Sequence, residues 1–403
     1  MNNRDRFVIT GMGMVTPSGM NSEQSWHALL QGRSGVSILS FYDRTEGTVA
    51  YPAGVVRLND DQEARNRLSN IMSPREITRS SHYINLAMLA ADEALRQAEW
   101  YGLTEREKER TAVSIESAYG CILSILNADT ALHQKGRKTV SAFTSPLSLL
   151  SMAASAISIQ CGFRGPVSAP SVACAAGLQS FGEALYLLKQ GHADVIVAGG
   201  SEAPLHPAVY AGCHSAGALS TLQNIPPESA SRPFDVSRNG FVLAEGAAVF
   251  IILKLSHAEK RHISPLAEIV GYGASSDATH ITAGHINGDG IARAMVLALQ
   301  DSNIPPSFIG YLSAHATSTP TGDIRECRGI KQIFQSDTSV SISSVKGVFA
   351  HTQGAALAAG ATIMELRHNL FLHTANTITP DPEMAGLDLI LHHPRIKKPV
   401  MQW

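Results

Sequence analysis

Three side chains in this 403-residue sequence have types and neighbours suited to nucleophilic catalysis: Cys174, His315 and His351. Cys174 follows an extended run that begins at Val167, and it precedes a segment with apolar residues at helical spacing. We expect it to lie at a helix N-terminus, where backbone N–H groups and the helix dipole favour a thiolate over a thiol. Taken alone, a cysteine among alanines is equally compatible with a small buried hydrophobe.

The two histidines stand at predicted junctions between a strand and a loop. His315 and His351 each follow a short run of small and β-branched residues, and the carboxyl ends of such strands carry the active sites of α/β proteins. The segment from Ala355 to Leu370, just after His351, predicts a helix. A helix N-terminus lowers the pKa of a nearby histidine, so we expect a neutral imidazole that donates one N–H. The chain has 16 histidines, so His315 or His351 considered alone could instead have a structural role.

The composition excludes several classes of protein. The formal net charge is −2, charged residues make up 16% of the chain, and no basic or acidic block occurs, which argues against nucleic acid or a charged membrane surface as a partner. No apolar run is long enough to span a bilayer. The five cysteines are scattered without a C-x-x-C pair, which argues against a disulfide framework and predicts a cytoplasmic location.

Strand-like and helix-like segments alternate along the chain, and this alternation predicts an α/β fold with parallel strands joined by crossover helices. A strand that enters a Gly-x-Gly sequence occurs at 7–13 and again at 267–273. The repetition predicts two related halves, 1–255 and 256–403. The clearest predicted elements are a helix at 82–98 and strands at 7–10, 111–115, 194–200 and 309–314.

Two further patterns suggest ligand sites but fit them poorly. The glycine-rich segment 11–19 begins like a dinucleotide fingerprint, but Pro17 follows where a helix must open to hold a pyrophosphate. Asp277, His280 and His285 carry metal-binding groups at a spacing that matches no common site. We therefore expect neither a metal nor a cofactor.

The segment Ser171–Gly177 resembles the nucleophile motif of the β-ketoacyl-acyl carrier protein synthases, and His315–Pro320 resembles their first histidine motif. Lys346, five residues before His351, matches their lysine–histidine motif. The resemblance runs from about residue 7 to 390 and points to the elongating, Cys-His-His branch of the thiolase superfamily. It implies a thiolase-like fold of two duplicated α/β halves in a layered αβαβα arrangement, usually as a dimer.

The resemblance also implies a reaction. Cys174 would take an acyl chain from the phosphopantetheine of an acyl carrier protein, while backbone N–H groups hold the oxyanion. His315 and His351 would donate hydrogen bonds to the thioester carbonyl of a malonyl-carrier as CO2 leaves. The resulting carbanion would attack the acyl group on Cys174 and give a 3-oxoacyl-carrier two carbons longer, in fatty acid or polyketide/polyene synthesis.

Four more residues receive roles by the same resemblance. Lys346 and Glu326 correspond to the charged pair that supports the family's site, and Thr317 and Thr319 correspond to hydroxyls that bind the pantetheine amides. From the residues alone, Lys346 and Glu326 could equally form an ordinary solvated ion pair worth about 0–1 kcal/mol.

The sequence departs from the family in two respects. Ala316 and Ala350 stand where the family usually has glycine, and their methyl groups could narrow the pocket. The family also continues beyond the position of Trp403 through a loop that supplies a second oxyanion N–H and a final strand, so we expect the half 256–403 to lack these elements.

Two other functions are therefore alternatives to an elongating enzyme. One is a catalytically impaired, chain-length-factor-like subunit that pairs with a related ketosynthase chain instead of forming a homodimer. The other is a thiolase or starter-type synthase that uses coenzyme A. The two histidines and the spacing from Lys346 to His351 favour the elongating branch.

Overall fold

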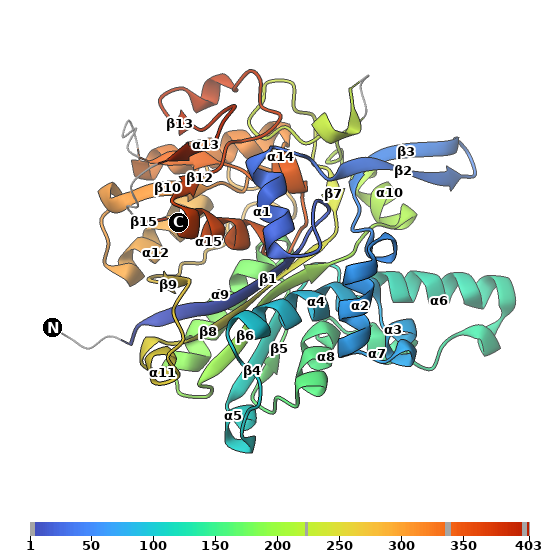
Figure 1. The fold of residues 1–403 in the computed structure, drawn as a ribbon. Coiled ribbons are helices and arrows are strands. Elements are labelled where there is room, and N and C mark those ends of the chain that lie inside the picture. The colour runs from blue at the N-terminus through green and yellow to red at the C-terminus, as the bar shows by residue number, and fades with distance from the viewer. Residues whose placement is uncertain (1–4, 222–224, 335–339, 397–400, 403) are drawn as a thin grey trace.

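A computed structural model describes residues 5–221, 225–334, 340–396 and 401–402. Two main sheets run through the described part of the chain (Figure 1). The larger sheet has six strands, in spatial order β5 (Val167–Ser168), β4 (Thr111–Glu116), β6 (Val195–Glu202), β8 (Gly246–Lys254), β1 (Phe7–Val15) and β9 (Ala267–Ile269). The smaller has four, in the order β13 (Asp388–Leu389), β11 (Ser341–Ser343), β10 (Ile309–Ser313) and β15 (Met401–Gln402).

Strand direction agrees only in part with the predicted parallel pairing. The pairs β4–β5 and β4–β6 are parallel, and so are the described pairs of the smaller sheet. The strand β8, however, runs antiparallel to both β6 and β1, and β9 runs antiparallel to β1. The larger sheet is therefore mixed, because β8 runs between β6 and β1 in the opposite direction to both.

Helices cover both faces of the larger sheet. Side chains of α4 (His82–Gln97) and α8 (Met152–Cys161) share one apolar core with β1, β4, β6 and β8. Side chains of α9 (Ala176–Lys189) and α15 (Leu357–His368) share a second core with the opposite face of the same strands. Strands covered on both faces need apolar side chains at nearly every position, which is why their sequences are continuous hydrophobic runs.

The smaller sheet lies on the other side of α9 and α15, as Figure 1 shows. One of its cores is shared with α12 (Asp289–Ser302) and α13 (Pro320–Phe334). In a separate small core, Tyr311 of β10 stacks on Phe371 with ring centroids 4.6 Å apart. The successive layers are helix, sheet, helix, sheet and helix, so the αβαβα arrangement implied by the sequence resemblance is confirmed.

The remaining elements surround these layers. Two small sheets are formed by β2 (Val36–Asp43), β3 (Gly47–Gly54) and β7 (Leu243–Ala244), and by β12 (Leu370–Phe371) and β14 (Arg395–Ile396). The other α-helices are α1 (Ser22–Leu30), α2 (Gln62–Ile71), α3 (Pro74–Arg79), α5 (Glu105–Glu109), α6 (Ile122–Lys135), α7 (Thr144–Leu147), α10 (Pro207–Ser215), α11 (Leu255–Lys260) and α14 (Lys346–Phe349). In Figure 1 the helix α6 projects away from the sheets.

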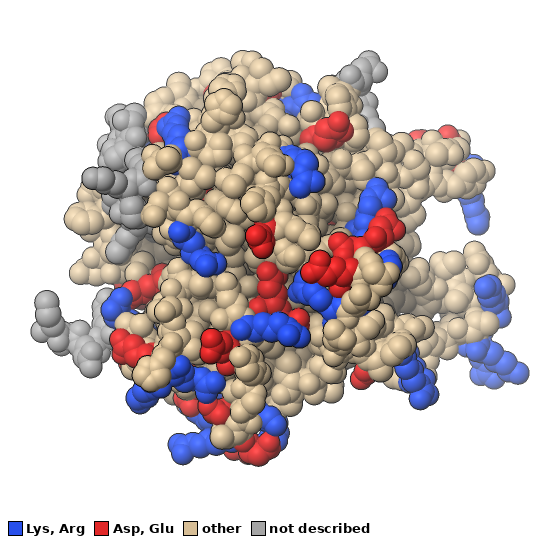
Figure 2. Space-filling model, in the orientation of Figure 1, with Lys and Arg blue, Asp and Glu red and all other residues tan. Residues whose placement is uncertain are grey.

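Charged side chains are spread over the surface of the described residues (Figure 2). On the face drawn in Figure 2, residues of both signs are interspersed and neither sign forms a continuous block. No helix in the described ranges combines the length and the apolar character needed to cross a membrane.

The predicted boundary at residue 255 does not separate the sheets, because β9 follows it in sequence but pairs with β1 of the larger sheet. The two segments of the chain therefore share one sheet. Their division into 1–255 and 256–403 stays a prediction.

The glycines of the segment 11–19 have a packing role. The strand β1 continues through Gly11 and Gly13 to Val15 and does not end at Thr10 as predicted. A Cβ atom at Gly11 would lie 2.1 Å from the carbonyl oxygen of Ala94. At Gly13 it would lie 2.1 Å from the carbonyl oxygen of Ala90, also in α4. These glycines let α4 approach the strand backbone, which accounts for the Gly-x-Gly pattern without a nucleotide.

This contact gives a prediction for stability. Gly13→Ala should lower the free energy of unfolding by about 1–3 kcal/mol or more, because the new methyl group overlaps a helix carbonyl in a closely packed core. Chemical denaturation of the full chain measures the change. Gly212→Ala is the matched control: Gly212 lies exposed in α10 with no atom within 4 Å of the added Cβ, so the same substitution should stabilise by up to about 1 kcal/mol. Equal stability of the two variants would contradict the packing role.

Candidate functional site

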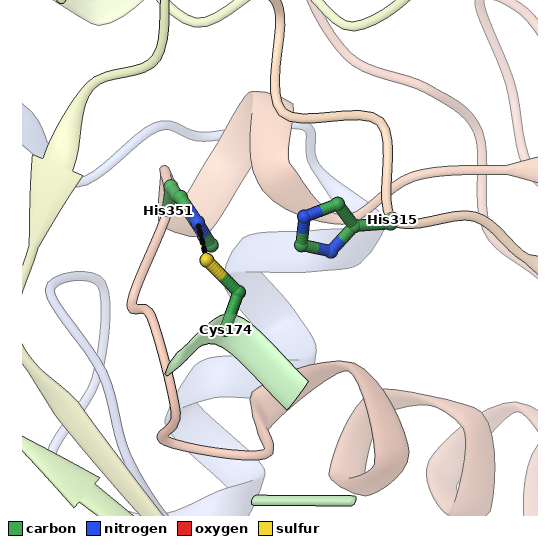
Figure 3. A group of neighbouring side chains, drawn as sticks. All are labelled: Cys174, His315 and His351. Carbon is green, nitrogen blue, oxygen red and sulfur yellow. Dashed lines mark hydrogen bonds between the residues drawn. The ribbon is translucent and has the colours of Figure 1, made fainter. Parts of the chain in front are cut away.

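Cys174 lies between a strand and a helix, close to the predicted position. It occupies a short 3-10 turn, Ala173–Ala175, that leads directly into α9. Ala173 has φ +52°, in the left-handed region that side chains other than glycine rarely adopt. This strained turn lifts the cysteine side chain out of the start of α9 and toward the two histidines (Figure 3).

The sulfur contacts the second half of the chain directly. Cys174 Sγ lies 3.0 Å from His351 Nε2 and 3.2 Å from Gln353 Oε1. The ring of His315 stands almost perpendicular to that of His351, with centroids 5.3 Å apart. Figure 3 shows all three side chains pointing toward one another from different segments. The structure therefore brings together the three residues that were singled out from the sequence.

The protonation state of the cysteine differs from the expected thiolate. Burial raises the pKa of Cys174 to about 11, and the nearby Lys346 ammonium opposes this rise without cancelling it. Loss of hydration is the larger effect, because it disfavours the charged form more strongly than one buried cation favours it. Burial therefore favours a thiol over a thiolate at neutral pH.

Burial favours a neutral ring at both histidines, whereas the sequence predicted this effect from the helix after His351. Burial holds the pKa of His351 well below its usual value, and the neighbouring His315 and Lys346 lower it further. Burial and then Lys346 lower the pKa of His315 in the same direction. The side chain of His315 is nevertheless exposed, whereas His351 is buried. Neutral rings can each accept a proton on one nitrogen and donate from the other.

Glu326 positions the first histidine through its backbone. Its carboxylate, on α13, accepts hydrogen bonds from the N–H groups of His315 and Ala316, each 2.6 Å long. The carboxyl group is buried, and burial raises its pKa while these bonds and Lys346 lower it. Glu326 therefore fixes the turn that carries the His315 ring.

Lys346 acts on the site through its charge. Its side chain is buried at the start of α14, five residues before His351. Burial lowers the pKa of the ammonium, and Glu326 and then Cys174 raise it. In the described part of the chain no direct ion pair joins Lys346 to Glu326, so the expected charged pair exists as an interaction at a distance and not as a contact.

Backbone hydrogen bonds hold the second histidine. The N–H of His351 donates to the carbonyl of Val242 over 2.9 Å, and its own carbonyl accepts from Ala244 over 3.1 Å. The ring of Phe241 meets that of His351 edge-on, with centroids 5.5 Å apart. A short parallel bridge between segments about 110 residues apart thus determines where His351 points.

The two alanines that replace the family's usual glycines both have positive φ. Ala316 has φ +23°, and Ala350 has φ +59° with ψ −164°, a region that is almost exclusive to glycine. Both are buried in apolar cores, so their methyl groups do not narrow an open pocket as the sequence suggested. What they add is backbone strain beside each histidine.

The threonines predicted to bind pantetheine face each other. Thr317 Oγ1 and Thr319 Oγ1 lie 3.1 Å apart and share a hydrogen bond. The N–H of Thr319 donates to Asp323 over 3.2 Å, and its carbonyl accepts from the guanidinium of Arg238 over 3.0 Å. Their role toward a ligand stays a prediction.

Sequence reasoning missed Glu202 and Gln353. The carboxylate of Glu202, at the end of β6, accepts hydrogen bonds from the N–H groups of Ala118, Tyr119 and Gly354. Burial raises the pKa of Glu202 to about 7, and its charge raises that of Cys174. An acidic residue that ends an otherwise apolar strand was the available signal for Glu202. Gln353 lay within the second histidine motif, but only the fold shows that it meets the sulfur.

The rejected metal constellation does not assemble. His280 Nδ1 accepts from the backbone of Thr282 over 3.2 Å, whereas His285 Nδ1 lies 3.0 Å from Asp289 of α12. Among the described residues, the one group of histidine, cysteine and acidic side chains close enough to hold an ion is Cys174, His315 and His351. Asp277, His280 and His285 therefore do not act as one site.

The strain at Ala350 gives a prediction. Ala350→Gly should raise the free energy of unfolding by about 1 kcal/mol, because relief of a glycine-type conformation outweighs the loss of one buried methyl group. Ala355 is also buried but lacks positive φ, so Ala355→Gly should destabilise by about 1 kcal/mol. Thermal and denaturant unfolding of both variants measures the two changes in stability. If Ala350→Gly lowered the free energy of unfolding, the claim that Ala350 is strained would be refuted.

Two family models together match most of the chain. The family described as "Beta-ketoacyl synthase, N-terminal domain" matches residues 4–258, and "Beta-ketoacyl synthase, C-terminal domain" matches residues 266–377. The "3-oxoacyl-[acyl-carrier-protein] synthase, mitochondrial" of Arabidopsis thaliana is 38% identical over 394 residues, which cover 94% of this chain and 85% of that protein. The "3-oxoacyl-[acyl-carrier-protein] synthase 2" of Vibrio harveyi is also 38% identical, over 97% of this chain and 92% of its own.

A solved structure extends the likeness to the fold. It is described as a type II PKS acyl-carrier protein in complex with its ketosynthase bound to the hexaketide. It is 30% identical to this chain with a TM-score of 0.83, and the match covers 97% of this chain and 93% of that one. The predicted thiolase-like fold is thus confirmed, and the chain belongs to the β-ketoacyl synthase family.

Proposed function

We propose that the protein is an elongating 3-oxoacyl-acyl carrier protein synthase, an acyltransferase that performs decarboxylative Claisen condensation. The observation that carries this proposal is the contact of 3.0 Å between Cys174 Sγ and His351 Nε2, with a second neutral imidazole, His315, beside it. A nucleophile with two neutral hydrogen-bonding groups suits both halves of the reaction, namely acyl transfer and stabilisation of an enolate.

The first half transfers an acyl chain to the enzyme. Cys174 attacks the thioester of an acyl-carrier, forms a new carbon–sulfur bond, and releases the carrier's phosphopantetheine thiol. The Cys174 proton moves through His351 Nε2, the nearest base, to the departing sulfur. Since both groups are neutral beforehand, no separated charge has to be stored in the buried site before substrate arrives.

The second half forms a carbon–carbon bond. A malonyl-carrier loses CO2, and His315 and His351 donate hydrogen bonds to its thioester carbonyl while the enolate develops. His351 acts here as the tautomer that carries its proton on Nε2, because its Nδ1 is buried. The enolate carbon then attacks the acyl carbonyl on Cys174, the carbon–sulfur bond breaks, and the departing sulfur takes one proton from solvent to restore the thiol. The product is a 3-oxoacyl-carrier that is two carbons longer.

The other residues position these groups. Glu326 holds the turn of His315, and the charge of Lys346 adds to the burial that lowers the pKa of both imidazoles. Thr317 and Thr319 would exchange their mutual hydrogen bond for bonds to the pantetheine amides of the substrate.

The partner follows from the substrate. An acyl carrier protein with phosphopantetheine-linked acyl and malonyl groups would dock on this chain, which would work in the cytoplasm as a homodimer or as a heterodimer with a related ketosynthase chain. The family models that match 4–258 and 266–377 support a division of the chain into a nucleophile half and a histidine half. A catalytically impaired, chain-length-factor-like role is less well supported, because Cys174, His315 and His351 lie within reach of one another.

Loss of the nucleophile separates the two half-reactions. Cys174→Ala should no longer gain the mass of an acyl group when it is incubated with acyl-carrier. The rate of condensation should fall by about 1,000-fold or more. Decarboxylation of malonyl-carrier should continue, because both imidazoles remain. Intact-protein mass spectrometry and CO2 release measure the two activities, with Cys161→Ala in α8 as the control. A Cys174→Ala enzyme that still condensed would refute the proposal.

The charge of Lys346 gives a prediction on pH. In the native enzyme both imidazoles stay neutral as the pH falls through about 6.5, the ordinary pKa of histidine, so malonyl decarboxylation should decline only in more acidic solution. Lys346→Met removes a charge that lowers the pKa of both rings, which should move this acid limb to higher pH. The exposed Lys260→Met is the control. If decarboxylation by Lys346→Met declined at the same acidic pH as in the native enzyme, this electrostatic role of Lys346 would be contradicted.

A further inference from the structure

The three catalytic side chains also have the composition of a metal site. Cys174, His315 and His351 each offer one ligand atom, and these atoms all lie within 4.8 Å of one another (Figure 3). Thiolate and imidazole are the ligands that zinc prefers, with Zn–S distances of about 2.3 Å and Zn–N distances of about 2.0–2.1 Å. Such distances place tetrahedral ligand atoms about 3.5 Å apart, so small side-chain rotations would bring these three to zinc geometry.

We propose that Cys174, His315 and His351 bind one zinc ion, which prevents the sulfur from reacting with electrophiles. The ion acts here as an inhibitor and not as a resident cofactor. The fourth position falls to a water molecule or to Gln353 Oε1, which lies 3.2 Å from the sulfur. Three protein ligands with a variable fourth are typical of zinc sites that stay open to solution.

An ion can reach this site. Cys174 is partly accessible and the His315 side chain is exposed, so a path leads from solvent to two of the three ligands. His351 is buried behind them and has a buried Nδ1 without a hydrogen-bond partner, while its Nε2 faces the sulfur. The ligating nitrogen of His351 is therefore Nε2.

The surrounding charges oppose one another. The Lys346 ammonium acts on all three ligands and disfavours a cation. Glu202 acts on Cys174, and Glu326 acts on Lys346, so two buried carboxylates offset that ammonium. Binding should thus be weaker than at a structural zinc site, and reversible.

The binding step is a proton exchange without oxidation or reduction. As the Zn–S bond forms, the S–H bond of Cys174 breaks and its proton passes to solvent, while both imidazoles bind through lone pairs of their neutral rings. One proton leaves for each ion that binds. The affinity for zinc should therefore fall as the pH is lowered. Protons compete with the ion first for the Cys174 sulfur and, at lower pH, for the imidazole nitrogens. The bound sulfur has no free thiol to alkylate or acylate.

The test uses the unliganded full-length chain and zinc alone, in competition with a chromogenic chelator. One ion should bind per chain, and Cys174→Ala and His315→Ala should each weaken binding by about 100-fold or more. Cys161→Ala removes a thiol of α8 outside the cluster and should leave affinity unchanged. Magnesium, a hard ion, should not compete. Absence of stoichiometric binding, or undiminished affinity in Cys174→Ala, would overturn the proposal.

A second readout needs no variant of the site. Zinc should slow the alkylation of Cys174 by iodoacetamide at least about tenfold when most of the chains hold an ion. A chelator that removes the zinc should restore the rate. Cobalt should give a sulfur-to-metal charge-transfer band that Cys174→Ala lacks, while circular dichroism checks that the variants are folded. Alkylation that zinc does not affect would refute the inference. Since neither assay contains a carrier or acyl substrate, these outcomes are independent of the proposed condensation.

Discussion

The site depends on keeping Cys174 and His351 uncharged where they meet inside the fold, with the more exposed His315 beside them. The contact of 3.0 Å between Cys174 and His351 joins residues 177 positions apart in sequence, so it exists only when the layers of the fold are assembled. Burial raises the pKa of the thiol and lowers those of both rings, which makes the neutral pair the resting state. In the proposed mechanism, reactivity then comes from proton transfer during attack, and not from a thiolate stored in the apolar interior.

Buried carboxylates hold this arrangement through the backbone. Glu326 accepts two N–H groups at the turn of His315, and Glu202 accepts N–H groups from the segment at 118–119 and from Gly354. Each satisfies donors that would otherwise be unpaired in the interior, where an unmade hydrogen bond costs about 1–3 kcal/mol. The charge of Lys346 meanwhile disfavours a proton on either ring. The catalytic groups are thus positioned by polar residues that need not touch a substrate.

Local patterns in the sequence predicted much of this structure, and long-range contacts explain the rest. Cys174, His315 and His351 were recognisable because each stands at a strand or helix boundary within a short motif, and the strand β4 and the helix α4 were evident from periodicity. A thiolate was expected at Cys174 from the sequence, whereas burial raises the pKa of this thiol. The helix start is visible in the sequence, but the burial is not. The extension of β1 through its glycines needed the position of α4, and the hydrogen bonds of Glu202 needed the folded chain.

The protonation state of the unliganded site tests this account most directly. Nitrogen-15 NMR of histidine-labelled protein at neutral pH, with signals assigned by His315→Ala and His351→Ala, reports whether each ring carries one proton or two. The account predicts two neutral rings whose charge does not change in Cys174→Ala. A doubly protonated His351 that becomes neutral in Cys174→Ala would reveal a thiolate–imidazolium pair and contradict it.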